Sequence, residues 1–368
     1  MANDYLKDEG QFPFYCGFLV LTYACNQDCV WCYAKQEVAR ARKAIREESA
    51  SEYASKYFMN LDAAKQSLDL MKGIGIRRVG LIGGEAGLHP KLLEIIRYAR
   101  RSGIKISFYT NGRILANRNF TAALKEAGTD TVNISVQSGP REAEVHNTTV
   151  RAKAWKQTDE GIWLAKKLGM KTIIQTVITH EVSPRYKDIL DHYSNTNSTF
   201  IFYREVPIFY PDATCLNQKI LGNRATKRAY KEIYSYAKPL GIKTYLFSRM
   251  PLCWWDPQDV VEREIRKQVV SHCHILTGLN LIVDVNGKVL PCVQWMKQHI
   301  LDLFPEGKIL GKDQFTREWR NGKPSEFRRT LTYYPSKNCT ICPEFGKSCT
   351  GGCPLIPFEL GPFAPKLP

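Results

Sequence analysis

The segment LTYACNQDCVWCYA, residues 21–34, places three cysteines, Cys25, Cys29 and Cys32, in a C-x3-C-x2-C spacing. Three thiolates this close together can hold three irons of a cubic iron–sulfur cluster, which leaves the fourth iron open to another ligand. A zinc site usually has paired C-x2-C motifs and four ligands, and ferredoxin motifs supply a fourth cysteine. The spacing therefore favours a catalytic cluster, with a structural metal as the alternative.

An apolar run at residues 17–22 comes directly before these cysteines and predicts a buried strand. The cysteines should then lie on the loop that leaves the C-terminal end of a first strand. This is the end at which α/β barrels carry their chemistry.

Strand and helix patterns alternate from this point to about residue 207. The predicted strands cover residues 17–23, 78–82, 105–109, 131–136, 171–178 and 200–206. The predicted amphipathic helices cover residues 61–72, 91–101, 117–126, 154–168 and 185–192. Six βα units are too few for a closed eight-fold barrel. Because βα crossovers are right-handed, the pattern predicts an α/β fold with a partial, open (β/α)6 parallel barrel.

The cysteine motif, with Trp31 before the last cysteine and Tyr33 after it, resembles the cluster loop of radical S-adenosylmethionine (radical SAM) enzymes. The second predicted strand is followed by Gly83, Gly84 and Glu85. In that family a Gly-Gly-Glu sequence at this place binds the amino group of S-adenosylmethionine (SAM). Glycines let a backbone approach a ligand closely, and a carboxylate can pair with an ammonium.

Two further strand ends extend this resemblance. The third predicted strand ends in a turn sequence at Asn111 that the family also shows. The fourth carries Ser135 and Gln137, where relatives contact the ribose and carboxylate of SAM, although many relatives have Asp in place of Gln137. An ordinary strand residue is the alternative for Ser135. The resemblance thus implies cofactor binding by Tyr33, Gly83, Gly84, Glu85, Asn111, Ser135 and Gln137.

A second cysteine-rich region begins at Cys273. Residues 281–292 predict a β-hairpin around an Asn-Gly turn, with Cys273 and Cys292 at its flanks. Four more cysteines follow at Cys339, Cys342, Cys349 and Cys353. This pattern resembles the small cysteine-rich SPASM domain, the auxiliary-cluster extension of radical SAM enzymes. The predicted domains are a core at 1–210, a bridge at 211–262 and a SPASM-like domain at 263–368.

The SPASM resemblance implies one or two auxiliary four-iron clusters. One would take Cys273, Cys292 and Cys353, and the other would take Cys339, Cys342 and Cys349. The fourth ligands stay open: Cys253 could complete the first set, or that cluster could keep an open iron for substrate. One auxiliary cluster with unused cysteines and a zinc ribbon are the alternatives.

The resemblance also implies the reaction. An electron donor such as flavodoxin or ferredoxin reduces the first cluster, SAM is cleaved to a 5′-deoxyadenosyl radical, and that radical abstracts hydrogen from a C–H bond. The candidate catalytic and substrate residues are Tyr203, Arg204, Glu205, Cys215 and Cys253. A salt bridge is the alternative for Arg204 and Glu205. The Cys253 thiol could donate hydrogen, bind iron or be buried.

Two substrate classes remain. Most SPASM enzymes oxidise or cross-link a peptide or protein, which is the first expectation. The second is a small metabolite such as a sugar or aminocyclitol, oxidised or epimerised. Only about sixteen residues precede the first predicted strand, too few there for a separate leader-peptide-binding domain, and this favours the second class. A pure electron-transfer protein needs no amine-binding carboxylate, so Glu85 argues against that reading.

Composition and charge limit the cellular location and the kinds of partner that the sequence predicts. The chain has 368 residues, 44% of them hydrophobic, twelve cysteines and a net charge of +16. Neither a secretory signal nor an apolar run of membrane-spanning length is present, which predicts a cytoplasmic protein whose thiols bind metal. The basic residues form no stripe with interleaved aromatics, and anionic clusters would offset part of the charge, so nucleic acid is an unlikely partner.

Overall fold

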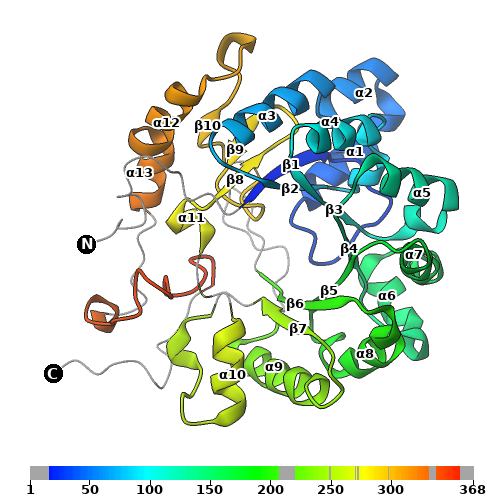
Figure 1. The fold of residues 1–368 in the computed structure, drawn as a ribbon, viewed down its shortest axis with the longest axis vertical. Helices are drawn as coiled ribbons and strands as arrows, with labels where there is room; N and C mark the ends of the chain where they lie inside the picture. The colour runs from blue at the N-terminus through cyan, green and yellow to red at the C-terminus, as the bar shows by residue number, and fades with distance from the viewer. Residues whose placement is uncertain are drawn as a thin grey trace.

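The structure is a computed structural model that describes residues 16–206, 220–247, 250–269, 271, 273–296, 298–330 and 337–356. One sheet of ten strands runs through it in the order β10-β9-β8-β1-β2-β3-β4-β5-β6-β7. Strands β1 to β7 pair in parallel and in chain order, and they curve into an open barrel (Figure 1). The predicted α/β class with a partial parallel barrel is confirmed.

The parallel strands are β1 (Cys16–Thr22), β2 (Arg78–Gly83), β3 (Lys105–Thr110), β4 (Thr131–Ser135), β5 (Thr172–Ile178), β6 (Thr199–Arg204) and β7 (Thr244–Phe247). The first six match the predicted strands to within two residues at each end. The seventh comes from the predicted bridge. It pairs in parallel with β6, so the barrel sheet continues one strand further than the six predicted units.

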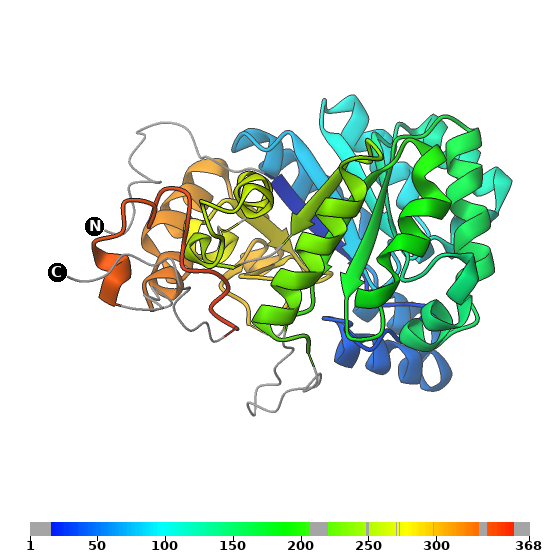
Figure 2. The same ribbon diagram turned by 90° about the horizontal axis from the view of Figure 1, so that it is seen from below.

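Helices cover the outer, convex face of this sheet (Figures 1 and 2). They are α1 (Lys35–Glu47), α2 (Ala50–Tyr57), α3 (Leu61–Gly73), α4 (Leu92–Arg101), α5 (Arg118–Ala127), α6 (Ala143–Val150), α7 (Trp155–Lys167), α8 (Tyr186–Tyr193), α9 (Asn223–Ala237) and α10 (Val260–Gln268). Short 3-10 turns include η2 (Ala86–Leu88), η3 (Arg113–Ala116) and η7 (Leu252–Trp254). Among the helices that precede β6, α1, α2 and α6 are absent from the sequence prediction.

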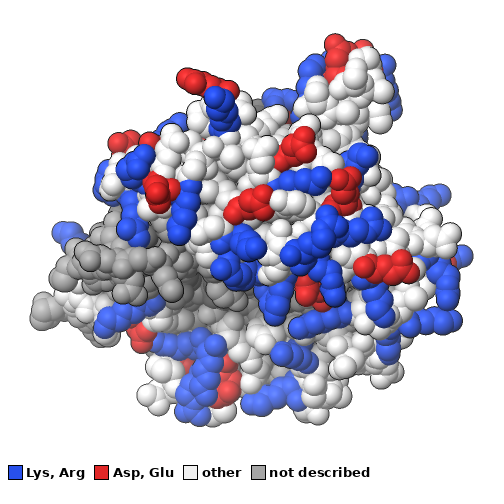
Figure 3. All heavy atoms as spheres, turned by 45° about the horizontal axis from the view of Figure 1, so that its top comes forward, with Lys and Arg blue, Asp and Glu red and all other residues white. Residues whose placement is uncertain are grey.

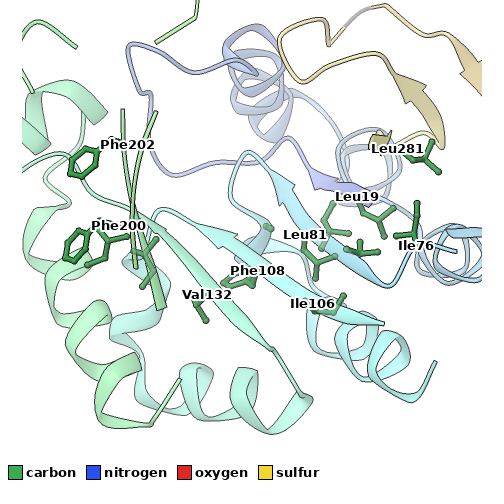
Figure 4. Close-up of a cluster of buried hydrophobic side chains, with 14 of the residues drawn as sticks. Leu19, Ile76, Leu81, Ile106, Phe108, Val132, Phe200, Phe202 and Leu281 are labelled. Atoms are coloured by element: carbon green, nitrogen blue, oxygen red, sulfur yellow. The ribbon is translucent and has the colours of Figure 1, made fainter. Parts of the chain in front are cut away.

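The main hydrophobic core lies between the sheet and these helices (Figure 4). Phe108, Val132 and Phe202 are fully buried members of it. Successive side chains of a strand point to opposite faces of the sheet. Residues at the intervening positions, such as Asn133 and Tyr203, therefore face the inside of the barrel.

The C-terminal region contains the predicted hairpin. It comprises α11 (His274–Thr277), β8 (Asn280–Val283), β9 (Lys288–Leu290), β10 (Leu301–Asp302), α12 (Lys312–Asn321) and α13 (Lys323–Thr330). Strands β8 and β9 are antiparallel, and Gly287 in their turn has a φ of +76°. The Asp284 carboxylate accepts the N–H groups of Asn286 and Lys288 at 2.9 Å. The Asn-Gly turn is thus confirmed, with an added side-chain cap.

The hairpin does not form a sheet of its own. Strand β8 pairs in parallel with β1, from Cys16 opposite Asn280 to Leu19 opposite Val283. A hairpin pattern specifies its own turn but not the strand that its outer edge will meet, so the sequence could not predict this partner. The domain boundaries at 210 and 262 stay predictions, although β7 and β8 both join the sheet of the core.

Charged side chains of both signs are interspersed over the face in Figure 3, with the basic ones in excess. This distribution agrees with the net charge of +16 and with the scattered basic residues of the sequence. Within the part of the chain that the structure describes, no helix has the length and apolar character to cross a bilayer.

Candidate active site

The three cysteines of the first motif lie on the loop between β1 and α1, at the C-terminal end of the parallel strands. Each is half-buried. The N–H of Cys32 donates to the carbonyl of Cys29 at 3.2 Å, and the N–H of Lys35 donates to the carbonyl of Cys32 at the same distance. The last cysteine therefore leads directly into α1, and the predicted position of the motif is correct.

Helix α6 holds the middle of this loop. The N–H groups of Asp28 and Val30 donate to the carbonyls of Val150 and Thr149, each at 3.0 Å. Carbonyls in the last turn of a helix have no partner within the helix, so they are available to a neighbouring segment. The unpredicted α6 thus helps to fix the cysteine loop in place.

Basic side chains surround the loop. Lys35 Nζ lies 3.3 Å and Arg151 Nη1 lies 3.4 Å from the Asp28 carboxylate. Arg42 Nε donates to the carbonyl of Cys25 at 3.4 Å. An iron–sulfur cluster with thiolate ligands is anionic, and cations this close to the loop would lower the cost of holding that charge in a half-buried site.

The chemistry of the donor set fits a cluster. Burial raises the pKa of Cys25 to about 12 and that of Cys32 to about 11, and it raises the pKa of Cys29 well above its usual range. The neighbouring cysteines raise the pKa values of Cys25 and Cys29 further. Thiolates in such a site need a positive partner, which iron supplies as it displaces the protons.

A cubic cluster takes one thiolate per iron, so its ligands need not meet at one point. Among the described residues, no three His, Cys, Asp or Glu side chains converge as the ligands of a single metal ion would. The zinc alternative for the C-terminal cysteines stays a prediction.

The Gly-Gly-Glu segment after β2 runs directly against the start of the cysteine loop. The N–H of Gly84 donates to the carbonyl of Thr22, and the N–H of Glu85 donates to the carbonyl of Ala24, both at 2.8 Å. A Cβ at Gly84 would lie 2.4 Å from the Ala24 carbonyl oxygen, so only glycine fits. This glycine is therefore required by a close approach between two segments of the chain, and the contacts of Gly83 and Gly84 with SAM stay predictions.

The Glu85 side chain is buried and rigidly held. Its Oε1 accepts the N–H of Gly87 at 2.9 Å, and its Oε2 accepts the N–H of Asn111 at 2.7 Å. Burial raises the pKa of Glu85, and these two hydrogen bonds oppose that change. A fixed carboxylate with an uncompensated burial cost suits an ammonium ligand, because pairing would stabilise both charges.

Asn111 links the end of β3 to the cysteine loop, since its Nδ2 donates to Asn26 Oδ1 at 2.6 Å. The Tyr33 hydroxyl donates to the Gly83 carbonyl at 3.1 Å. The structure therefore brings Tyr33, Glu85 and Asn111 together around the three cysteines. Their contact with SAM stays a prediction.

The amide of Gln137 is engaged within the protein. The side chain is fully buried, its Oε1 accepts the N–H of Val177 at 3.1 Å, and its Nε2 donates to Ser135 Oγ at 3.0 Å. These bonds tie the end of β4 to β5. They give Gln137 a structural role, and the contacts of Gln137 and Ser135 with SAM stay predictions.

Three polar side chains form a row on the inner face of the barrel. Gln175 Nε2 donates to Asn133 Oδ1 at 3.2 Å and to the Tyr203 hydroxyl at 3.0 Å. The Tyr203 ring in turn lies 5.1 Å from the Phe247 ring. Tyr203 was predicted from the sequence as a substrate residue, whereas Asn133 and Gln175 were not. Each of these two residues is polar and stands at an inward-facing position of an otherwise apolar strand, and this pattern could have identified both from the sequence.

The other substrate candidates on β6 are buried. Arg204 is on the face opposite to Tyr203, is 6% exposed and donates to Asn223 Oδ1. Burial lowers the pKa of Arg204, and the nearby Cys353 opposes that change. Glu205 is buried as well. The proposed roles of both residues stay predictions, as does the salt bridge between them.

The C-terminal cysteines come from separate segments. Cys349 is close enough to Cys342 for that neighbour to raise its pKa, after burial as the main cause. The N–H of Gly351 donates to the Cys349 sulfur at 3.3 Å. The N–H of Cys273 donates to Thr350 Oγ1 at 2.7 Å, so Cys273 lies beside the same segment. Cys292 follows β9, and its sulfur accepts a backbone N–H at 3.5 Å.

Cys253 lies on η7, half-buried against the main core. The backbone of its neighbour Leu252 hydrogen-bonds the Cys349 sulfur. The SPASM resemblance allows Cys253 as a further ligand of the set that contains Cys273, whereas this contact places the segment of Cys253 beside Cys349 of the other set. Cys215 lies outside the described residues.

Comparison with known proteins identifies the core. A family model of the Radical SAM superfamily, whose members use a four-iron cluster with SAM, matches residues 19–193. A probable GTP 3',8-cyclase of Metallosphaera sedula is 31% identical over 175 residues, which are 47% of this chain and 50% of that protein. An AdoMet-dependent heme synthase of Oleidesulfovibrio alaskensis is 28% identical over 46% of this chain and 39% of that protein. The chain spans about half the length or less of these curated relatives.

Solved structures share the fold over a longer range. SuiB of Streptococcus suis, bound to its precursor peptide SuiA, has a TM-score of 0.69 and 15% identity over 93% of this chain and 72% of its own. Native anSMEcpe with bound AdoMet has a TM-score of 0.64 and 18% identity over 92% of this chain and 89% of its own. Residues 19–193 therefore match the Radical SAM superfamily model, and the chain as a whole shares its fold with SuiB and anSMEcpe.

Proposed function

We propose that this protein is a radical SAM enzyme that cleaves SAM reductively and removes hydrogen from a C–H bond of a peptide or protein, which is thereby oxidised or cross-linked. The observation that carries the proposal is the direct contact between the cysteine loop and the Gly-Gly-Glu segment, through the 2.8 Å bond from Glu85 N–H to the Ala24 carbonyl. This contact supports the proposal because it brings Glu85, to which we assign the SAM ammonium, beside the loop that carries the three cysteines.

In this proposal Cys25, Cys29 and Cys32 hold the first cluster, and the bound cluster and SAM supply the radical chemistry. The part of the chain is to bind and orient. Glu85 receives the SAM ammonium without rearrangement, because both of its oxygens are already fixed by backbone N–H groups. The apolar cluster of Val20, Tyr23 and Ile82, against which Cys25 and Cys32 pack, excludes water from one side of the site.

The C-terminal cysteines hold auxiliary four-iron clusters as electron relays or substrate anchors. The proximity of Cys342 and Cys349 supports their assignment to one set. The contact of Leu252 with the Cys349 sulfur supports Cys253 as the missing fourth ligand of that set. The remaining set is Cys273, Cys292 and Cys353.

A peptide substrate is supported by the fold neighbours. SuiB has been solved with its precursor peptide, and anSMEcpe has been solved with AdoMet and the Cp18Cys peptide. The row of Asn133, Gln175 and Tyr203 on the inner face of the barrel offers amide and hydroxyl groups to a polar backbone. We assign these three residues to the substrate side of the site.

A small metabolite such as a sugar or aminocyclitol, oxidised or epimerised, is the second candidate. It is favoured by the sequence relatives, one of which is named for a reaction of GTP. The same polar row would suit hydroxyl groups.

The electron donor in this proposal is a flavodoxin or ferredoxin. The basic side chains of Lys35, Arg42 and Arg151 around the loop support an acidic carrier, because opposite charge speeds the encounter of two proteins.

Anaerobically reconstituted protein with SAM and dithionite tests the core of this proposal. We expect release of 5′-deoxyadenosine, measured by liquid chromatography. Glu85→Gln should weaken SAM binding, whereas Glu94→Gln, at a carboxylate that pairs with Lys65 on the helical layer, should not. Fully loaded protein that releases no 5′-deoxyadenosine would contradict the proposal.

The substrate class needs a separate assay. Short peptides encoded beside the gene, incubated with the protein, should lose two hydrogens per oxidation by mass spectrometry. Turnover of a sugar or aminocyclitol, with every such peptide unchanged, would select the second candidate.

A further inference from the structure

Gln27 stands between Cys25 and Cys29 and is only 4% exposed. The Cys29 thiol donates to its Oε1 across 3.6 Å. The other end of the amide, Nε2, is buried and has no hydrogen-bond partner among the residues that the structure describes. A buried N–H donor without a partner is costly and calls for an explanation.

The backbone of Gln27 is fixed from two sides. Its carbonyl accepts a hydrogen bond from the Arg42 guanidinium. Its backbone also hydrogen-bonds the Cys25 sulfur. Gln27 therefore contacts two of the three sulfurs of the motif, and its side chain has little freedom beyond rotation of the terminal amide.

The polar neighbours of Gln27 in the loop have other partners. Asn26 Oδ1 accepts from Asn111 at 2.6 Å, and the Asp28 carboxylate pairs with Lys35 and Arg151. The Gln27 amide is thus the loop side chain that is directed at a motif sulfur.

Iron ligation changes what Cys29 can do. A thiolate has no proton, so it can accept a hydrogen bond but cannot donate one to Oε1. Two acceptors would then face each other. A half-turn of the amide exchanges Oε1 and Nε2, whose shapes are nearly the same, and gives the unpartnered N–H a sulfur acceptor.

We propose that in the iron-loaded protein Gln27 Nε2 donates a hydrogen bond to the Cys29 thiolate and thereby raises the reduction potential of the cluster. The inference rests on the proposed function, because it requires Cys29 to bind iron. A hydrogen bond to a ligating sulfur stabilises the more negative, reduced cluster, and such bonds are among the factors that set cluster potentials. Gln27 is a positioning residue and does not touch the reacting atoms.

Redox titration of the anaerobically reconstituted protein, followed by EPR, tests the inference. The relevant signal is the one that added SAM perturbs. In Gln27→Leu the amide is lost, and the midpoint potential should fall. In the isosteric Gln27→Glu an ionised carboxylate offers only acceptors, and the potential should fall further. A tenfold loss of reduced cluster at a fixed electrode potential corresponds to 59 mV for one electron.

Gln157→Leu is the matched control. Gln157 is exposed, and its Oε1 accepts from Arg113 Nε at 2.7 Å, so the same chemical change occurs beside the loop without contact to a sulfur. Its potential should equal that of the unmodified protein. An unchanged potential in Gln27→Glu, or an equal shift in Gln157→Leu, would overturn the inference.

The experiment distinguishes a failure of the proposed function from a failure of the inference about Gln27. If the unmodified protein gives no EPR signal that responds to SAM, the proposed function fails before Gln27 is tested. If Gln27→Leu does not load iron, the size-matched Gln27→Glu decides the inference by itself.

Discussion

The two cysteine-rich regions of this protein are assembled in different ways. The first group lies within positions 25–32 on one loop, whereas the second extends from position 273 to position 353. The cysteines of the first group share one segment, which backbone bonds to Val150 and Thr149 of α6 hold in place. The second depends on side-chain and backbone contacts between distant segments, such as Cys273 with Thr350. For a site confined to one loop the spacing indicates the ligand set, whereas for a site spread over several segments it indicates the kind of region but leaves the ligand sets open.

The largest effect should come from removing the first group. The triple variant Cys25→Ala, Cys29→Ala, Cys32→Ala lacks every protein ligand of the first cluster. We expect 5′-deoxyadenosine formation with dithionite to fall to background, and about four irons per chain to be lost, as for one cubic cluster. Iron analysis and chromatography measure both. Continued cleavage of SAM would show that this loop is not the radical site.

The opposite pattern should follow from the second group. Cys339→Ala with Cys342→Ala should also remove about four irons per chain, because two ligands of one cluster are lost. Cleavage of SAM by dithionite should persist, since the first loop is unchanged, while substrate turnover should fail. If SAM cleavage is lost as well, the two regions are not independent and the comparison breaks down.

Cys253→Ala tests whether Cys253 belongs to the second cysteine-rich region as an iron ligand. Because Leu252 contacts the Cys349 sulfur, we expect the auxiliary EPR signal and the iron content to change. Cys16→Ala is the control: its sulfur donates to Asn280 Oδ1 at 3.4 Å in the sheet, and its iron content should be normal. Intact clusters with normal SAM cleavage and no product would instead assign Cys253 as a hydrogen donor.

The smallest effect should come from disturbing the packing of the Gly-Gly-Glu segment against the first cysteine loop. Gly84→Ala would force a Cβ to within 2.4 Å of the Ala24 carbonyl oxygen, and we expect a loss of about 1–3 kcal/mol of unfolding free energy. Gly73→Ala, with no atom within 4 Å of the added Cβ at the end of α3, should be neutral or slightly stabilising. Denaturant titration compares the two. Equal stability would mean that the loop adapts freely to the Gly-Gly-Glu segment.

The sequence predicted the parts of the molecule that local patterns encode. The six strands, the Asn-Gly hairpin and the position of the cysteine loop follow from apolar runs and turn residues. Helix α6 could not be found in this way, because its sequence AEVHNTTV is rich in residues of low helix propensity. Its tie to the cysteine loop through Thr149 and Val150 is a tertiary contact.

The hydrogen-bond partners of individual side chains could not be predicted from the sequence either. The sequence predicts a cofactor contact at Gln137, which stays a prediction, but it does not show that the amide of this residue bonds Ser135 and Val177. The row of Asn133, Gln175 and Tyr203 comes from three strands that are adjacent only in the folded sheet. Motif spacing identifies the donors of a site, and the fold decides which of them meet.

The pairing of β1 with β8 has a consequence for how the chain reaches this structure. Cys16 and its partner Asn280 are 264 positions apart, so translation at about 5–20 residues per second separates them by an interval on the order of 10–50 s. Throughout that interval the apolar β1 exposes a row of unpaired N–H and C=O groups, a ready template for another strand. Pairing of this edge of β1 thus waits until residues 280–283 have been made, and protection of the nascent chain from association during that interval would favour correct folding.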